Sequence, residues 1–226
     1  MEKVRVGIIG LGFMGTTHFG IHQANPKAQV VAVADIDKVK LTGNISAVVG
    51  NIGTRDSDQL DFSGIKTYEN ALDLINSPDV DMVDICVPTF LHKKFALAAI
   101  KAGKHVFLEK PFSRNLDEVK EIAAAARASD KNFNVGMCVR AWPEYFDART
   151  RFKAGEFGAL KSANFRRLSP SVDGNSWENW FMNNQRSGSA ILDLHMHDID
   201  LVRFFFGKPR AVNAFGLRGF RSDDGI

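Results

Sequence analysis

Three polar side chains recur at helical spacing within residues 190–206, a segment that is otherwise almost entirely apolar. At about 100° per residue, Asp193, His197 and Asp200 fall within about 60° of one another on one helix face. Burying carboxylates and an imidazole costs several kcal/mol unless they are paired or used. His197 could therefore accept a proton from a hydroxyl group near neutral pH. The alternative is an internal network in which Asp200 only orients His197.

A second histidine invites a metal interpretation of the same segment, because His195 lies two residues before His197. Residues two apart on a helix point about 200° away from each other, so these two rings could share a metal only on a strand. We therefore predict no metal site.

A glycine-rich loop follows the first predicted strand and opens a helix, the context in which such loops bind dinucleotides. Its first glycine permits a tight turn, its second lets a pyrophosphate approach the backbone, and its third lets helix and strand pack closely. Asp35 follows about 20 residues later, where a carboxylate can bind a ribose hydroxyl and repel a 2′-phosphate. This arrangement favours NAD over NADP. The alternative to dinucleotide binding is a glycine-rich turn in another α/β protein, with Asp35 merely solvated. The expected cofactor-binding residues here are Gly10, Gly12, Phe13, Met14, Gly15 and Asp35.

Two further segments lie at the carboxyl ends of predicted strands, which is the edge where open α/β sheets bind ligands. One carries Pro88, Thr89 and His92, and the other is the tripeptide Glu109-Lys110-Pro111. We expect both to line the cofactor crevice. Position alone leaves Lys110 open to three roles: solvated, paired with Glu109, or catalytic.

Together these motifs resemble the Gfo/Idh/MocA family, which includes the glucose–fructose oxidoreductase and inositol dehydrogenase-like enzymes. The resemblance extends through the whole chain, because Gly188, Asp193, His197, Asp200 and Gly207 match the family pattern G…DxxxHxxD…G. His195 stands where many members carry a small residue. Gly188-Ser189 stands where a run of glycines is common.

The resemblance implies an NAD- or NADP-dependent oxidoreductase that acts on a hydroxyl carbon of a sugar, polyol or cyclitol. It places Lys110 near the nicotinamide and substrate, with Asp193 and His197 facing it across the cleft. It also implies homodimers or homotetramers. Some members are non-catalytic NAD-binding regulators, but the presence of all three residues favours an enzyme.

The elements that must position these residues are readable in the first half of the chain. Strands alternating with helices predict a doubly wound parallel sheet, with a dinucleotide-binding domain over residues 1–139. The expected strands are 4–9, 30–34, 65–68, 83–87, 105–108 and 133–139; the expected helices are 14–24, 39–49, 92–102 and 115–129; and residues 50–63 are expected to form a surface loop. His18, on the first helix, is expected to serve packing or the surface.

The pattern changes over residues 140–226, which we interpret as an α+β substrate and oligomerisation domain. The family resemblance implies a mostly antiparallel sheet there. Helices are expected at 143–154 and 190–206, strands at 160–168 and 211–220, and a loop at 169–185. Since the chain ends just after a predicted strand and family members are usually longer, we expect a piece of a longer protein with an incomplete sheet.

Composition excludes several classes of protein. With 45% hydrophobic and 24% charged residues over 226 positions, the chain is neither disordered nor fibrous. A net charge of +3 without a basic patch argues against nucleic acid, and no apolar run reaches the ~18 residues of a membrane span. Cys86 and Cys138 both lie in apolar strand-like runs, so we expect free thiols and a cytoplasmic location.

Overall fold

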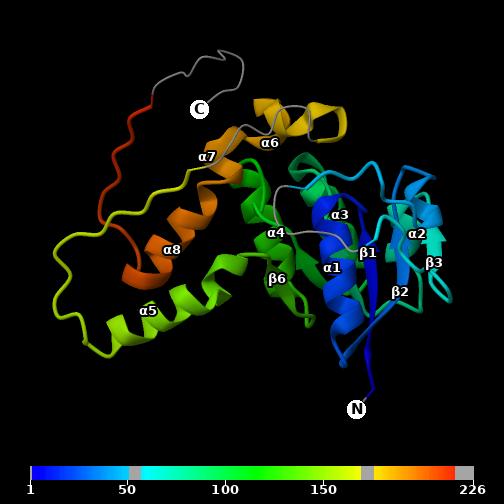
Figure 1. Cartoon of the computed structure of the whole chain (residues 1–226), viewed down its shortest axis with the longest axis horizontal. Helices are drawn as coiled ribbons and strands as arrows, with labels where there is room; N and C mark the ends of the chain where they lie inside the picture. Colours follow the sequence, from blue (N-terminus) through cyan, green and yellow to red (C-terminus); the bar gives the residue numbers. More distant parts are fainter. Residues whose placement is uncertain (1, 51–56, 169–175, 217–226) are drawn as a thin grey trace.

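Six parallel strands form the sheet of the first half, in the order β3-β2-β1-β4-β5-β6. The computed structural model describes residues 2–50, 57–168 and 176–216 (Figure 1). The sheet order reverses direction between β1 and β4, which opens a crevice at the carboxyl ends of these two strands. The expected doubly wound sheet is thus confirmed. Its strands are β1 (Val4–Ile9), β2 (Ala28–Ala34), β3 (Lys66–Tyr68), β4 (Met82–Ile85), β5 (His105–Leu108) and β6 (Phe133–Val135).

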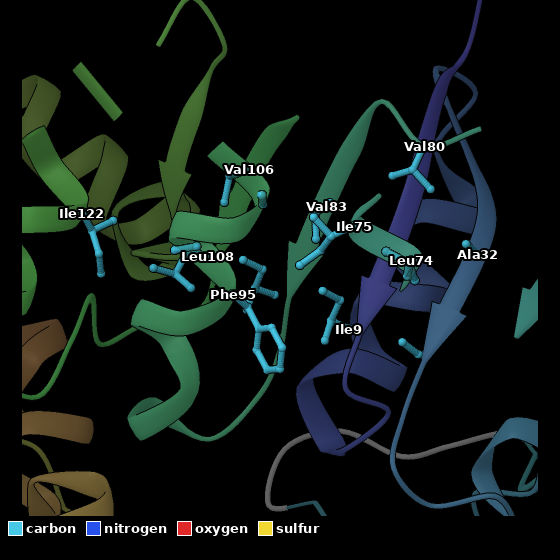
Figure 2. Close-up of a cluster of buried hydrophobic side chains, with 14 residues drawn as sticks. Ile9, Ala32, Leu74, Ile75, Val80, Val83, Phe95, Val106, Leu108 and Ile122 are labelled. Carbon is cyan, nitrogen blue, oxygen red and sulfur yellow. The ribbon is translucent and has the colours of Figure 1, made fainter. Parts of the chain in front are cut away.

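Helices cover both faces of this sheet because its strands are apolar on both sides. On one face, Val6 and Ile8 of β1 pack with Phe19 of α1 (Phe13–Ala24). On the other face, a larger core joins the strands to α2 (Ala71–Ile75), α3 (His92–Lys101) and α4 (Leu116–Ala128), as Figure 2 shows. Successive strand residues therefore alternate between the two cores. Asn115 caps α4, its side chain accepting a hydrogen bond from the Glu118 amide at 3.0 Å.

The second half is mostly helical and lies beside β6 (Figure 1). It has a small core of its own, in which Val139, Leu201 and Phe205 are buried among further aromatic rings. Its α-helices are α5 (Pro143–Lys153), α6 (Asn184–Ser187), α7 (Ser189–Asp193) and α8 (Met196–Phe206). Short 3-10 helices occur in both halves: η1 (Lys40–Thr42), η2 (Thr89–Leu91), η3 (Cys138–Ala141) and η4 (Trp177–Met182). No helix among the described residues is long and apolar enough to cross a membrane.

The helix predicted over residues 39–49 is wrong. Only η1 forms there, and it ends at Gly43, whose positive φ of 87° is the left-handed conformation that closes a helical turn. Asn44 then forms an isolated antiparallel bridge with Gln59, across the loop whose residues 51–56 lie outside the described part. Tertiary pairing of Asn44 therefore replaces a second turn of helix. The short helix α2 was not predicted from the sequence.

The strand predictions for the second half are also wrong where the structure describes them. Residues 160–168 and 211–216 contain no strand, and the described residues show no antiparallel sheet there; residues 217–220 and 169–175 lie outside the described part. Alternating side chains make a strand only when another strand lies alongside to complete the hydrogen bonds, and residues 160–168 and 211–216 pair with no strand among the described residues. The strand expected at 133–139 ends at Val135 because η3 follows.

Candidate active site

The glycine loop has the geometry that a pyrophosphate requires. A Cβ on Gly10 would lie 2.4 Å from the Cys86 carbonyl oxygen, and one on Gly15 would lie 1.8 Å from the Gly10 carbonyl oxygen. These two glycines are therefore needed for backbone packing. A Cβ on Gly12 would meet nothing within 4 Å, so the loop is open on that side. Gly12 also caps α1 with no side-chain hydrogen bond, which leaves the first-turn N–H groups available to phosphates.

Asp35 lies directly against this loop, at the end of β2. Its carboxylate accepts hydrogen bonds from the backbone N–H of Leu11 at 2.7 Å and of Asp37 at 2.8 Å. A carboxylate offers about four acceptor sites, so two remain for ribose hydroxyls. The loop and Asp35 together fit an adenine dinucleotide.

His92 is fully buried and joins the two other predicted cofactor segments. Its Nδ1 is 2.8 Å from the Pro111 carbonyl oxygen, and its Nε2 is 2.9 Å from the Val87 carbonyl oxygen. Burial lowers the pKa of His92. Both ring nitrogens face backbone carbonyl oxygens, to one of which the neutral ring donates a hydrogen bond, so we assign this residue to bracing the loop of Pro88 and Thr89 against the Glu109-Lys110-Pro111 turn.

The structure brings Lys110 and Asp193 together from different halves of the chain. The Lys110 Nζ donates to an Asp193 carboxylate oxygen at 3.0 Å and to the Asp193 backbone carbonyl at 3.1 Å. Asp193 is only 5% exposed. Burial raises the pKa of Asp193, and the neighbouring Lys110 ammonium opposes that rise. An ammonium has three donors, so one remains for a substrate oxygen.

His197 is the third member of the predicted group. Its Nδ1 is buried without a hydrogen-bond partner among the described residues. Burial first, and the positive charges of Lys110 and Arg167 next, lower the pKa of His197 to about 4. The ring is therefore neutral at physiological pH.

The single long helix predicted at 190–206 is wrong, and its break rearranges the acidic residues. The helix is interrupted between Asp193 and Met196. Asp200 does not orient His197, because both of its oxygens accept hydrogen bonds from Arg140. A residue that the sequence analysis missed, Asp198, is buried and paired with Arg167 at 2.7 and 3.0 Å. The sequence signal for Asp198 was its place in the first turn of α8, where an acidic side chain interacts favourably with the helix dipole.

A second polar cluster was also missed, on the α1 face of the sheet. His18 and His22 of α1 contact Asp84 of β4, and Cys86 follows that strand. Atoms of His18, Asp84 and Cys86 lie within 4.8 Å of one another, close enough for a metal. Their mutual hydrogen bonds already account for their burial, so the arrangement requires no ion. An acidic residue inside an otherwise apolar strand was the signal available in the sequence.

The chain matches known proteins along most of its length. Residues 4–137 match a family model described as an oxidoreductase family with an NAD-binding Rossmann fold, and residues 145–225 match a GFO/IDH/MocA C-terminal domain. It is 32% identical to levoglucosan dehydrogenase of Pseudarthrobacter phenanthrenivorans, with 95% of this chain and 54% of that protein covered. It is 28% identical to scyllo-inositol 2-dehydrogenase (NAD(+)) of Bacillus subtilis, with 91% and 55% covered.

A solved structure agrees with this match. The crystal structure of myo-inositol 2-dehydrogenase from Lactobacillus plantarum superposes with a TM-score of 0.71 at 25% identity, covering 91% of this chain and 57% of that one. The chain spans about half the length of the relatives it matches.

Proposed function

The chain belongs to the Gfo/Idh/MocA family of oxidoreductases and carries its NAD-binding Rossmann domain, and we propose that it transfers a hydride between a nicotinamide and a secondary hydroxyl carbon of a sugar, polyol or cyclitol. The observation that carries this proposal is the meeting of Lys110 with Asp193, 83 residues apart, near enough to His197 for the Lys110 charge to lower the pKa of its ring. The similarity to levoglucosan and scyllo-inositol dehydrogenases supports the substrate class.

Each of the three residues has a role that its surroundings support. His197 accepts the hydroxyl proton, because its lowered pKa keeps the ring in the unprotonated form that a general base requires. Lys110 uses its remaining donor to hold the same oxygen and stabilise the negative charge that develops there. Asp193 fixes the ammonium and accepts a hydrogen bond from a neighbouring substrate hydroxyl. The nicotinamide, when bound, supplies the hydride acceptor or donor.

The dinucleotide would be held by the glycine loop and Asp35. The loop's N–H groups bind the pyrophosphate, and Asp35 binds the ribose hydroxyls of NAD. The segments of Pro88 and Thr89 and of Glu109, Lys110 and Pro111 lie at the carboxyl ends of β4 and β5, beside the switch point. We propose that these segments line the nicotinamide side of the crevice.

The test follows reduced-nicotinamide absorbance with NAD and NADP separately, against pools of cyclitols, anhydrosugars, aldoses and polyols. Lys110→Ala should abolish the signal, whereas Lys120→Ala, a matched change of an exposed lysine on α4, should keep it. His197→Ala should lower turnover by about 100-fold or more and leave the Kd for NADH nearly unchanged. NADH binding without turnover in any pool would overturn the enzymatic proposal and favour a regulator.

A further inference from the structure

A buried charge network lies directly behind the tripeptide that carries Lys110, and the proposed reaction uses none of its histidines. His18 is at its centre, on the inward face of α1. Its Nδ1 is 3.0 Å from an Asp84 oxygen, and its Nε2 is 3.2 Å from a Glu109 oxygen. Its ring also meets Phe107 of β5 edge to face, with the centroids 5.6 Å apart. With a carboxylate at each nitrogen, His18 donates in both directions and is held as an imidazolium.

Glu109 connects this network to the lysine. One of its oxygens meets His18, and the other accepts a hydrogen bond from the backbone N–H of Lys110 at 3.1 Å. The carboxylate is nearly buried, at 7% exposure of the residue. Gly136 leaves room for it, since a Cβ there would lie 2.9 Å from the Glu109 oxygen. The Glu109 side chain thus bridges α1 and the Lys110 backbone.

We propose that His18 is a positioning residue that acts through Glu109 to hold the Lys110 backbone, and with it the ammonium, in the geometry for reaction. The inference rests on the proposed function, because it assumes that Lys110 contacts the substrate oxygen. A buried carboxylate without its hydrogen-bond donor at position 18 would turn toward other donors and release the Lys110 amide. Displacing a reacting group by about 1 Å costs about 100-fold in rate.

The chain offers a matched control for a purely structural role. His22 lies on the same helix face and binds the same carboxylate, its Nε2 being 2.8 Å from an Asp84 oxygen. No hydrogen bond joins His22 to Glu109 among the described residues. If the network only stabilised the packing of α1, the two histidines would behave alike. A positioning role requires that loss of His18 alone affects catalysis.

Two substitutions at position 18 separate its two contacts. The amide nitrogen of asparagine replaces Nδ1, so His18→Asn keeps a donor toward Asp84 and loses the one toward Glu109. The amide nitrogen of glutamine replaces Nε2, so His18→Gln keeps the donor toward Glu109. We expect kcat to fall by about tenfold to 100-fold in His18→Asn, and to stay within about threefold in His18→Gln and His22→Asn. The Kd for NADH should stay unchanged in all three.

The proposal is overturned if His18→Asn keeps the wild-type kcat, or if His18→Asn and His18→Gln lose activity equally. A second readout is independent of turnover. In protein labelled with ¹⁵N-lysine, the Lys110 amide signal is assigned by its loss in Lys110→Arg, and its hydrogen exchange is measured. Exchange should accelerate in His18→Asn and not in His22→Asn; equal exchange in both would overturn the proposal even if no substrate is ever found.

Discussion

At the scale of single residues, the site depends on charges whose surroundings hold them in one state. Asp193 is buried against Lys110, and His197 is kept neutral by burial and two nearby cations. His18 is the opposite case: burial alone would lower its pKa, but its hydrogen bonds to Asp84 and Glu109 raise it to about 10. Two histidines of one fold thus carry opposite charge states at neutral pH, each set by its neighbours.

Asp35 provides a residue-scale prediction about the cofactor. Asp35→Asn keeps an oxygen acceptor for the Leu11 amide, which Asp35 binds at 2.7 Å, and removes the charge together with the second oxygen, which accepts from the Asp37 amide at 2.8 Å. We expect this variant to bind NADPH about tenfold more tightly than the wild type, because the repulsion of the 2′-phosphate is lost. Fluorescence titration with NADH and NADPH measures the change, with Asp37→Asn as the control on the same loop. An unchanged ratio of the two Kd values would contradict the assignment of Asp35.

At the scale of elements, α1 has two functions at its two ends. Its amino end presents uncapped N–H groups beside the glycine loop. Its middle and carboxyl end present His18 and His22 to the buried Asp84 of β4, fastening the helix to the sheet through charge as well as through Phe19. The helix that opens the dinucleotide site is therefore also tied to the strands that carry the proposed catalytic lysine.

The hydrogen bonds of His18 to Asp84 and Glu109 predict how the free energy of unfolding depends on pH. The folded pKa of His18, about 10, lies above its unfolded value of 6.5, so folding takes up a proton between these values. The stabilisation is fully present below pH 6.5 and is lost as pH rises through 10. The free energy of unfolding should fall by roughly 1–3 kcal/mol between pH 7 and 9 from this group alone. Denaturant titrations should show a flatter profile for His18→Gln than for His22→Gln, and equal slopes would refute the charge assignment.

At the scale of the whole molecule, the chain has a large core in the first half and a small one in the second. The two cores of the sheet enclose most of the buried apolar residues, whereas the core of α5 and α8 rests on Val139, Leu201 and Phe205. Between the halves run polar contacts, among them Lys110 with Asp193 and the Arg114 guanidinium with the Gln185 carbonyl at 2.6 Å. The division into units at 1–139 and 140–226 stays a prediction.

Paired cavity-forming substitutions test that division. Leu201 and Leu74 are both fully buried, one in each half. Leu201→Ala should lower the local stability of the second half by about 2–5 kcal/mol, and Leu74→Ala should do the same to the sheet. Hydrogen exchange followed by mass spectrometry should show faster exchange in α5 and α8 for Leu201→Ala, with β1 and β4 unchanged. Uniform acceleration over both halves would show a single cooperative unit instead.

The sequence by itself determined the features that local chemistry encodes. The glycine loop and the alternating strands and helices of the first half depend on residues close together in the chain, whose periods of 2 and 3.6 can be read directly. Lys110, Asp193 and His197 were found through motif resemblance, and their roles stay proposals. What the sequence could not reveal was their pairing, since Lys110 and Asp193 are 83 residues apart and meet only through the path of the chain.

Only the tertiary structure decided the partners. Asp200 binds Arg140 instead of orienting His197, the helix at 190–206 is broken, and His18, expected to serve packing or the surface, reaches Glu109. The residues expected to form strands at 160–168 and 211–216 pair with no other strand among the described residues, so they form no sheet. Each outcome has the same physical reason: a buried charge or a strand edge is satisfied by whichever partner folding brings to it, and that partner is not recorded in the local sequence.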